Sequence, residues 1–429
     1  MANIPFTRLA ASLPASVPFV GPEAMERARG SAFDARIGAN ESACGPSPRA
    51  LEAMIAALET GEPRLYGDPE SHALRTALAR RHGIAPDEIV VDAGIDTLLG
   101  LSVRLFMEAE DTAIGSLGAY PTFAYHVAGF GGRLEAVPYR ALHEDPDALL
   151  AASHEHAARL VYLANPDNPM GTRVDREAVA NLIDSLPGRC LLLLDEAYAE
   201  YTDETLDPVN PPIDTADPRV IRFRTFSKAW GMAGMRIGYA IGHRDVIAGF
   251  ERVRNHFGVN RLAQVAALAS LGDAGHLERV RASVRAGRAR IEALADSHGI
   301  AWVASATNFV ALDFGDAARA EAVMGRLLDV GIFLRKPAVP PLDRHVRVGV
   351  GTDAELAALG LAAWDGKSVV DGALLQANHA AYRDLTPADL PGVRALVDGR
   401  AWVRPETWGE DVPHVVIGAP RATLGASTD

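Results

Sequence analysis

Short apolar runs alternate with helical patterns through the middle of the chain. Leu160–Ala164, Cys190–Leu194 and Val220–Phe223 are apolar almost throughout, as expected of strands that are buried on both faces of a parallel sheet. The stretch from Asp175 to Leu186, between the first two runs, has the pattern of a helix. Because such strands and helices alternate from about Ile89 to Gly242, we predict an α/β domain with a mainly parallel sheet.

Patterns outside this region predict an arm, a second domain and a tail. A helix is expected over Ser47–Leu58, with Ser47 as N-cap and Pro48 at its first position. From about Ala248 to His298 the pattern is helical again, and Trp302–Phe314 alternates as a strand does. We therefore divide the chain into an N-terminal arm (1–45), a large domain (46–250), a small domain (251–365) and a tail (366–429).

The helical stretch after Ala248 is rich in arginine and also contains glutamate. Mixed charges along a helix are typical of a face in contact with solvent. We interpret the following residues as such a solvated face: Arg252, Arg254, Arg279, Arg281, Arg285, Arg288 and Arg290, with Glu251, Glu278 and Glu292.

Composition narrows the class of protein. The 429-residue chain is 48% hydrophobic with a formal net charge of −13, and its basic residues are scattered, so no nucleic-acid partner is expected. No apolar run approaches the roughly 18 residues of a membrane span. The two cysteines, Cys44 and Cys190, cannot build a disulfide framework and stand in no metal-binding pattern. We expect a cytoplasmic protein in which both are small buried residues.

The segment from Arg224 to Gly238 concentrates reactive side chains. A desolvated lysine such as Lys228 is a nucleophile that forms a Schiff base with an aldehyde. Arg236 offers a bidentate fork for a phosphate, and Thr225 and Ser227 offer hydroxyl groups. Pyridoxal phosphate is a small molecule with both an aldehyde and a phosphate. The alternative interpretation is a polar turn with a surface lysine.

Two more polar clusters follow the apolar strands. Asn165–Thr172 comes after one strand and Asp195–Tyr198 after the next, and ligands of open α/β sheets bind at the carboxyl ends of strands. A carboxylate at Asp195 is costly to bury unless it is paired, and a protonated pyridine nitrogen is such a partner. A glycine turn precedes another helix, where the backbone amides of Ile95 and Asp96 suit a phosphate.

Three loop motifs occur in a fixed order along the chain: Asn40–Pro48, Asn165–Gly171 and Thr225–Gly238. In this order they resemble the entry loop, the Asn-Pro loop and the Schiff-base lysine segment of fold-type I aminotransferases, most closely those of the histidinol-phosphate aminotransferase group. The resemblance runs from about Phe19 to about Ala363. It implies the PLP-dependent transferase fold type I, in which helices flank a mainly parallel seven-stranded sheet and a smaller α+β domain follows.

The resemblance also implies roles for single residues. Lys228 holds the cofactor and moves the proton, Asp195 pairs with the pyridine nitrogen, and Phe123 stacks on the ring. The residues implied in cofactor binding are Ile95, Asp96, Phe123, Asn168, Asp195, Tyr198, Thr225, Ser227, Lys228 and Arg236, with Tyr66 reaching the phosphate from a second subunit. The residues implied in substrate binding are Asn40, Arg335 and Arg347, and no metal is expected.

The implied activity is pyridoxal-phosphate-dependent transamination by a homodimer. The amino donor would be histidinol phosphate, as in histidine biosynthesis, or an aromatic amino acid, and the acceptor 2-oxoglutarate. In the family a tyrosine hydroxyl of the arm helps to bind the substrate phosphate, and Phe19 stands at that position here. The resemblance ranks histidinol phosphate first, and the apolar Phe19 places aromatic amino acids close behind it. One alternative is a decarboxylase or lyase of the threonine-phosphate decarboxylase type, and another is a catalytically inactive binding module.

The tail has a resemblance of its own. Asn378–Leu385, Val397–Arg400 and Ile417–Gly418 resemble the C-terminal end of nucleotide-sugar dehydrogenases of the UDP-glucose type. The similar part spans only about 50 residues and lacks both a GxGxxG motif and a catalytic cysteine motif. We therefore expect at most an incomplete remnant of a UDP-binding domain.

Overall fold

The computed structural model describes residues 5–14, 20–202 and 208–361, and in the C-terminal region residues 373–375, 386–390, 393, 396–398, 408 and 414–416. The chain divides into two compact units, residues 1–360 and 361–429. Phe19, which the sequence places in the substrate site, lies outside the described residues.

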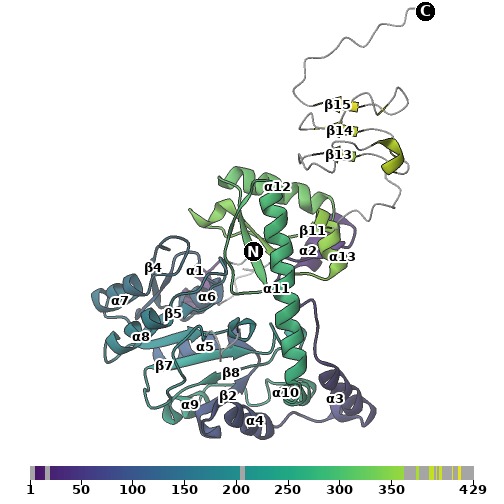
Figure 1. The fold of residues 1–429 in the computed structure, drawn as a ribbon. Coiled ribbons are helices and arrows are strands. Elements are labelled where there is room, and N and C mark those ends of the chain that lie inside the picture. Colours follow the sequence, from purple (N-terminus) through teal and green to yellow (C-terminus); the bar gives the residue numbers. More distant parts are fainter. Residues whose placement is uncertain are drawn as a thin grey trace, which may run out of the picture. The chain divides into compact units, whose positions relative to one another are not determined.

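Within the described residues, seven strands form the central sheet in the order β2-β8-β7-β6-β5-β3-β4 (Figure 1). The strands are β2 (Ile89–Asp92), β3 (Thr112–Ser116), β4 (Arg133–Val137), β5 (Leu160–Ala164), β6 (Leu191–Asp195), β7 (Val220–Thr225) and β8 (Gly238–Ile241). Neighbours from β7 to β4 are parallel, whereas β8 is antiparallel to both β7 and β2. The mainly parallel seven-stranded sheet predicted from the sequence is confirmed.

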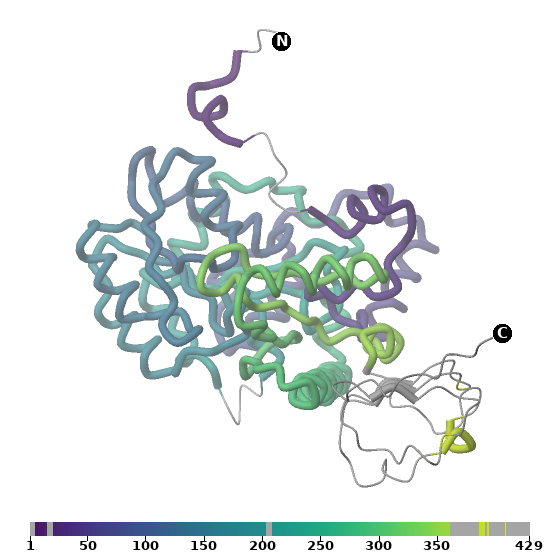
Figure 2. The backbone as a smooth tube through the Cα atoms, turned by 90° about the horizontal axis from the view of Figure 1, so that it is seen from above, coloured from purple at the N-terminus to yellow at the C-terminus, as the bar shows by residue number. Residues whose placement is uncertain are grey.

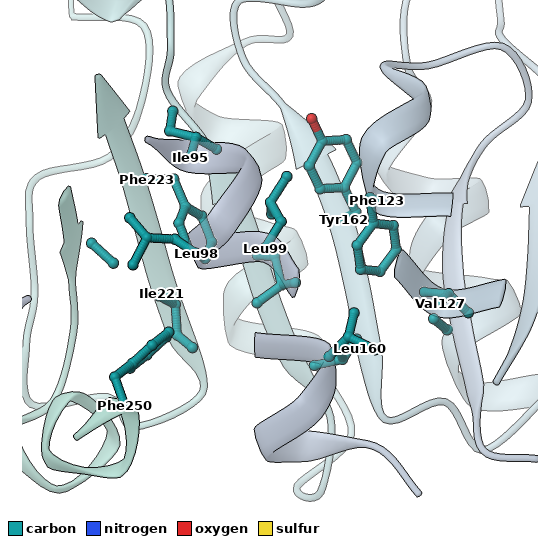
Figure 3. Close-up of a cluster of buried hydrophobic side chains, with 14 of the residues drawn as sticks. Ile95, Leu98, Leu99, Phe123, Val127, Leu160, Tyr162, Ile221, Phe223 and Phe250 are labelled. Atoms are coloured by element: carbon teal, nitrogen blue, oxygen red, sulfur yellow. The ribbon is translucent and has the colours of Figure 1, made fainter. Parts of the chain in front are cut away.

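Helices cover both faces of this sheet. The first face packs on α5 (Ile95–Phe106), α6 (Pro121–Phe130) and α9 (Arg244–Phe250), and the second on α7 (Pro146–Glu155) and α8 (Arg176–Ser185). Side chains alternate along each strand, so Leu160 and Tyr162 of β5 join the first apolar cluster, drawn in Figure 3, while Val161 and Leu163 join the second. This burial on both faces explains the continuous apolar runs in the sequence.

Helices also precede the sheet in the chain. They are α1 (Arg8–Ser12), α2 (Pro22–Arg29), α3 (Pro48–Glu59) and α4 (His72–His82). The predicted start of α3 is confirmed, because the Ser47 hydroxyl accepts a hydrogen bond of 3.2 Å from the backbone N–H of Ala50.

A second, smaller sheet follows the large one in the chain. Its described strands, β9 (Ala301–Val303), β10 (Phe309–Asp313) and β12 (His345–Gly349), are antiparallel in the order β12-β10-β9. The helices of this region are α10 (Arg261–Leu271), α11 (Ala274–Ser297), α12 (Ala317–Asp329) and α13 (Asp353–Leu356). The N-terminal segment contacts this region through a separate two-stranded sheet, in which β1 (Ala35–Arg36) pairs in parallel with β11 (Ile332–Phe333). In Figure 2 the purple N-terminal segment and the green segment run side by side.

Two predictions about burial are wrong. The first concerns the arginine-rich stretch, in which Arg254 and Arg281 are less than a tenth exposed. Both guanidinium groups are hydrogen-bonded within the protein: Nε of Arg281 donates to the carbonyl oxygen of Glu200 at 2.7 Å, and Nε of Arg254 donates to a Glu251 carboxylate oxygen at 2.8 Å. Of the two cysteines, Cys190 is buried but Cys44 is exposed.

The C-terminal unit contains a parallel sheet of short strands. In its described part these are β13 (Ala373–Leu375), β14 (Leu396–Asp398) and β15 (His414–Val416), in that order. Val397 and Asp398 of the dehydrogenase-like motifs belong to β14, whereas Asn378–Leu385 and Ile417–Gly418 lie outside the described residues. Searched over the residues that are described, the chain has no helix with the length and apolar character of a membrane span.

Candidate active site

The carboxyl ends of neighbouring strands bring the predicted polar residues together. Asp195 is the last residue of β6, Asn168 follows β5 and Lys228 follows β7, so all three lie at one edge of the sheet. They line a cavity of about 210 Å³, which we call the lysine cavity. The other predicted residues on its wall are Ile95, Asp96, Tyr198, Thr225, Ser227 and Arg236.

Lys228 lies against the loop that carries Asn40. Its Nζ donates a hydrogen bond of 3.1 Å to the backbone carbonyl of Asn40 and lies 5.6 Å from the centre of the Tyr198 ring. Nδ2 of Asn40 donates to the Tyr198 hydroxyl at 2.9 Å, while its Oδ1 has no partner among the described residues. Lys228 thus lines the cavity with its amine held by a backbone carbonyl of the Asn40 loop.

Asp195 is a buried carboxylate with two hydrogen-bond donors. Its Oδ2 accepts from the hydroxyl of Tyr162 at 2.8 Å, its Oδ1 accepts from the backbone N–H of Ala197 at 3.0 Å, and the residue is 5% exposed. Burial raises the pKa of Asp195 to about 6, although both hydrogen bonds oppose this shift. Pairing with a cationic group of a ligand would therefore stabilise the ionised form of Asp195.

A cationic cradle lines the same cavity as this carboxylate. At the start of α5 the first backbone N–H groups have no partner within the helix, and Arg236 reaches over this end, donating from Nη1 to Oγ of Ser227 at 3.4 Å. Only a glycine fits at position 94: its φ is +94°, and an added Cβ would lie 2.6 Å from Nη2 of Arg236. Together the helix start, guanidinium and hydroxyl suit a phosphate.

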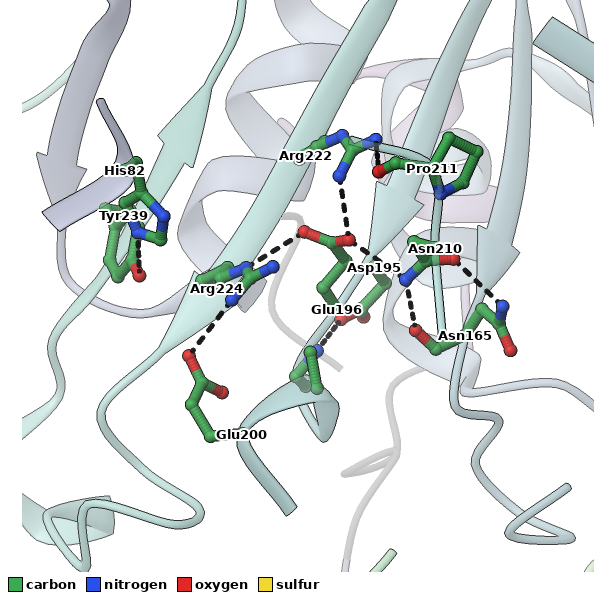
Figure 4. A network of polar contacts seen from close by, with 12 residues as sticks. His82, Asn165, Asp195, Glu196, Glu200, Asn210, Pro211, Arg222, Arg224 and Tyr239 are labelled. Atoms are coloured by element: carbon green, nitrogen blue, oxygen red, sulfur yellow. Dashed lines mark hydrogen bonds and ion pairs between the residues drawn. The ribbon is translucent and has the colours of Figure 1, made fainter. Parts of the chain in front are cut away.

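A buried network of charged groups connects the ends of neighbouring strands (Figure 4). The Glu196 carboxylate accepts hydrogen bonds from Arg224 at 2.9 Å, Arg222 at 3.2 Å and the Asn210 amide at 2.9 Å. Asn210 in turn donates to the backbone carbonyl of Asn165 at 2.9 Å. The network therefore ties β6 and β7 to the loop after β5, which fixes the edge on which Asp195 and Lys228 stand.

A second cavity of about 690 Å³ adjoins the first and shares Tyr120, Tyr162 and Asn168 with it. We call it the outer cavity. Arg347 and Arg335 line it. Arg347 donates to the Asn168 side-chain oxygen and, at 3.1 Å, to the carbonyl of Gly38.

The two arginines of the outer cavity differ in their surroundings. Burial lowers the pKa of Arg347, and its Nε finds no partner among the residues that the structure describes. Arg335 donates to the carbonyl of Val20 at 2.8 Å and lies over the Phe333 ring, with 5.5 Å from its guanidinium carbon to the ring centre. Arg347 is thus the better placed of the two to receive a buried anionic group from a substrate.

The structure does not bring Phe123 and Tyr66 to the lysine cavity. Phe123 is 2% exposed and stacks on Tyr162, with ring centres 5.1 Å apart, and it lines the outer cavity instead. The aromatic residues on the wall of the lysine cavity are Tyr120, Tyr162 and Tyr198, and the hydroxyl of Tyr120 donates to Asp96 at 3.1 Å. Tyr66 is 79% exposed, and its ring contacts Phe257, so its assignment to a second subunit stays a prediction.

The sequence interpretation missed Tyr120 and Tyr162. For Tyr162 a signal existed, since a tyrosine hydroxyl within a strand that is otherwise apolar must find a buried partner. Among the described residues, no group of three or more histidine, cysteine or acidic side chains is arranged to hold a metal ion.

A lysine amine, a buried carboxylate and a cationic cradle at the carboxyl edge of this sheet define the class of fold-type I transferases. The comparisons with known proteins agree with that class. The model of the family described as aminotransferase class I and II matches residues 36–360. The chain belongs to this family.

Individual relatives are similar over most of the chain. Histidinol-phosphate aminotransferase 1 of Nitrosococcus oceani is 35% identical over 333 residues, which cover 78% of this chain and 89% of the relative. Histidinol-phosphate aminotransferase of Sphingopyxis alaskensis is 37% identical over 336 residues, 76% of this chain and 89% of the relative. The crystal structure of histidinol-phosphate aminotransferase from Sinorhizobium meliloti in complex with pyridoxal-5'-phosphate is 48% identical, with a TM-score of 0.80, and covers 84% of this chain and 97% of that one.

Proposed function

We propose that the protein is a pyridoxal-phosphate-dependent aminotransferase that transfers an amino group from histidinol phosphate to 2-oxoglutarate. The observation that carries this proposal is the lysine cavity, in which Lys228, Asp195 and Arg236 converge on about 210 Å³. This donor set fits the cofactor, because an amine suits its aldehyde, a carboxylate its ring nitrogen and a cationic cradle its phosphate. When bound, pyridoxal phosphate supplies an electron sink for charge that develops at the α carbon of the substrate.

Each residue of the proposed active site has a separate role in transamination. Nζ of Lys228 would hold the cofactor through its aldehyde and, once released, would carry the proton from the α carbon of the donor to the aldehyde carbon of the cofactor. The carboxylate of Asp195 would hold the proton on the ring nitrogen. Tyr198 and Asn168 would hydrogen-bond the phenolic oxygen of the ring, and Arg347 would bind the acidic group of the substrate. These roles are supported by the placement of Lys228, Asp195, Tyr198 and Asn168 on the wall of the lysine cavity, and of Arg347 on the wall of the adjoining outer cavity.

The phosphate role of the cradle yields a prediction for Gly94→Ala. The substitution would put a Cβ 2.6 Å from Nη2 of Arg236, at a residue with φ +94°, and a left-handed backbone alone costs about 1–2 kcal/mol for a residue with a side chain. We expect roughly tenfold weaker binding of pyridoxal phosphate, measured by fluorescence titration. Gly188→Ala is the control, because no atom lies within 4 Å of its added Cβ. Equal affinities of the two variants would contradict the assignment.

The donor is inferred from the outer cavity. Arg335 and Arg347 offer cationic groups for a phosphate or a carboxylate, and Leu117, Phe123 and Phe333 form part of an apolar wall. Cations and apolar surface together suit histidinol phosphate, whose ring and phosphate lie on one molecule. The apolar wall also favours a second candidate function, transamination of aromatic amino acids, which agrees with the phenylalanine at position 19.

A substrate panel tests the proposed function. With 2-oxoglutarate as acceptor, we expect kcat/KM for histidinol phosphate to exceed the values for phenylalanine and tyrosine. The preference for histidinol phosphate over the aromatic amino acids should be reduced by the missing hydroxyl at Phe19, since a hydrogen bond to a charged group contributes about 1.5–3 kcal/mol. A preference for phenylalanine above about tenfold, beyond 1.4 kcal/mol, would assign the enzyme to aromatic donors, and release of carbon dioxide without a keto product would assign it to the decarboxylases.

We further propose that the protein is a homodimer of the cytoplasm, with a role in histidine biosynthesis. Leu51, Ile55 and Leu58 of α3 and the pair Tyr66–Phe257 expose large apolar side chains, and such surfaces often mark contacts between subunits. A second subunit on this surface explains why Tyr66 extends into solvent here, because its hydroxyl would bind the phosphate of the neighbouring site.

Complementation tests the sharing of sites. Tyr66→Ala and Lys228→Ala homodimers should each be defective, whereas refolding or co-expressing the two chains produces mixed dimers with one intact site. Because half of randomly paired dimers are mixed, the expected activity is about a quarter of the wild-type value. Activity no greater than the sum of the two variants would contradict the sharing.

A further inference from the structure

Tyr162 and Asp195 lie on the same face of the sheet, on adjacent strands. In the parallel pairing of β5 with β6, Tyr162 is opposite Leu193 and Ala164 is opposite Asp195. Since side chains alternate along a strand, residues 162 and 164 of β5 and residues 193 and 195 of β6 point to one face. The diagonal neighbours Tyr162 and Asp195 are therefore within reach of each other, and the hydroxyl lies 2.8 Å from Oδ2 of the carboxylate.

Packing holds the tyrosine in this position. Tyr162 is 1% exposed, and its ring stacks on Phe123 with an angle of 15° between the ring planes. In Figure 3 the two rings lie side by side within the apolar cluster, and the Tyr162 hydroxyl is at the end of the ring that points out of the cluster. Phe123 thus packs on Tyr162, and Tyr162 in turn hydrogen-bonds Asp195. Phe123 therefore acts on the lysine cavity by fixing the position of the Tyr162 ring.

We propose that Tyr162 is a positioning residue for transamination, whose hydroxyl holds the Asp195 carboxylate ionised and oriented toward the ring nitrogen of the cofactor. The inference rests on the proposed function, because it assigns a task to Asp195 that only a pyridine ring requires. No role for Tyr162 follows from the loop motifs, since it lies within an apolar strand rather than after one.

The electrostatics support this task. Burial raises the pKa of Asp195 to about 6, and the hydrogen bond from Tyr162 is the leading influence that lowers it. Burial also raises the pKa of Tyr162 well above its usual value, so the hydroxyl keeps its proton and remains a donor. Without this donor the folded pKa of Asp195 rises further, and a larger fraction of the carboxyl group is protonated near neutral pH.

Other charged groups near Asp195 are unchanged when the Tyr162 hydroxyl is removed. Asp96 at the start of α5 and Glu196, the next residue in the chain, both raise the pKa of Asp195. The Lys228 amine, the Arg236 guanidinium, the Glu41 carboxylate and the hydroxyls of Tyr198 and Tyr120 line the same cavity, and the buried Glu144 also interacts electrostatically with Asp195. Because they are common to wild type and variant, a ratio of the two affinities isolates the contribution of Tyr162.

The experiment compares Tyr162→Phe with Tyr139→Phe in the full-length protein. Tyr139 is the matched control, because its hydroxyl also donates at 2.8 Å to a buried aspartate, Asp167, which does not line the lysine cavity. The dissociation constant of pyridoxal phosphate is measured by fluorescence titration at about pH 6.5 and about pH 9. Melting temperatures of the apo-proteins report whether both variants fold.

We expect Tyr162→Phe to weaken binding of pyridoxal phosphate roughly ten- to hundredfold at the lower pH, the range of a hydrogen bond to a charged group. The deficit relative to wild type should shrink at the higher pH, where Asp195 ionises without help. Tyr139→Phe should change the affinity by less than about threefold, below 0.7 kcal/mol, at either pH. Phe123→Leu, which keeps the hydroxyl but removes the stacked ring, should give a smaller deficit with the same pH dependence.

Two results would overturn the inference while leaving the proposed function intact. One is equal affinity of Tyr162→Phe and Tyr139→Phe for pyridoxal phosphate, and the other is a deficit of Tyr162→Phe that does not shrink as the pH rises. Failure of the wild-type protein to bind pyridoxal phosphate would instead contradict the proposed function itself.

Discussion

Lys228→Ala is expected to reduce transamination by about a thousandfold or more, because a positioned general base contributes roughly 10²–10⁴ in rate and this residue also binds the cofactor. The amine of Lys228 is the group on the cavity wall that can both bind an aldehyde and carry a proton, and its neighbours Asn40 and Tyr198 cannot replace it. The measurement is kcat with the preferred donor and 2-oxoglutarate.

The control for this variant is Lys367→Ala, which removes a lysine from the C-terminal unit. It should keep near wild-type activity. If Lys228→Ala retained comparable turnover, another residue would have to supply the amine, and the assignment of the lysine cavity as the active site would fail.

Asp195→Asn is expected to reduce kcat by roughly a hundred- to several-thousandfold. An amide has the shape of the carboxylate but no charge, so the ring nitrogen loses its partner, and breaking a buried charge pair costs about 3–5 kcal/mol. Tyr162 and the backbone N–H of Ala197 both donate to Asp195, so an amide nitrogen at this position also faces a donor.

Asp245→Asn is the matched control for this charge change, because the Asp245 side chain is 87% exposed and lies on α9, away from the lysine cavity. It should leave kcat unchanged within about twofold, since exposed charges contribute little. An Asp195→Asn variant as active as this control would show that the carboxylate has no part in the reaction.

The parts of the fold that local chemistry determines could be predicted from the sequence. Continuous apolar runs indicated the buried strands β5, β6 and β7, and Ser47 followed by Pro48 indicated the start of α3. Alternating strands and helices imply a parallel sheet, and the carboxyl ends of parallel strands lie at one edge of the sheet. The polar residues that follow those strands therefore lie close together.

Other features depend on tertiary contacts that a linear pattern does not contain. The arginines of α11 have the spacing of an exposed face, yet Arg281 is buried because its guanidinium meets a backbone carbonyl from a distant loop. Phe123 was expected on the cofactor ring, but it stacks on Tyr162, because the packing of α6 on β5 decides which ring it meets. The 79% exposure of the Tyr66 side chain is likewise a tertiary feature that the linear pattern does not contain.

The central claim is that Lys228 is the amine that binds the cofactor. The chain contains only three lysines, Lys228, Lys336 and Lys367, so chemical trapping can discriminate among all of them. Borohydride reduction of the protein with bound pyridoxal phosphate converts a Schiff base into a stable secondary amine, and peptide mass spectrometry then locates it. We expect one phosphopyridoxyl group per chain, on the peptide that contains Lys228. A label on Lys336 or Lys367, or no label at all, would contradict it.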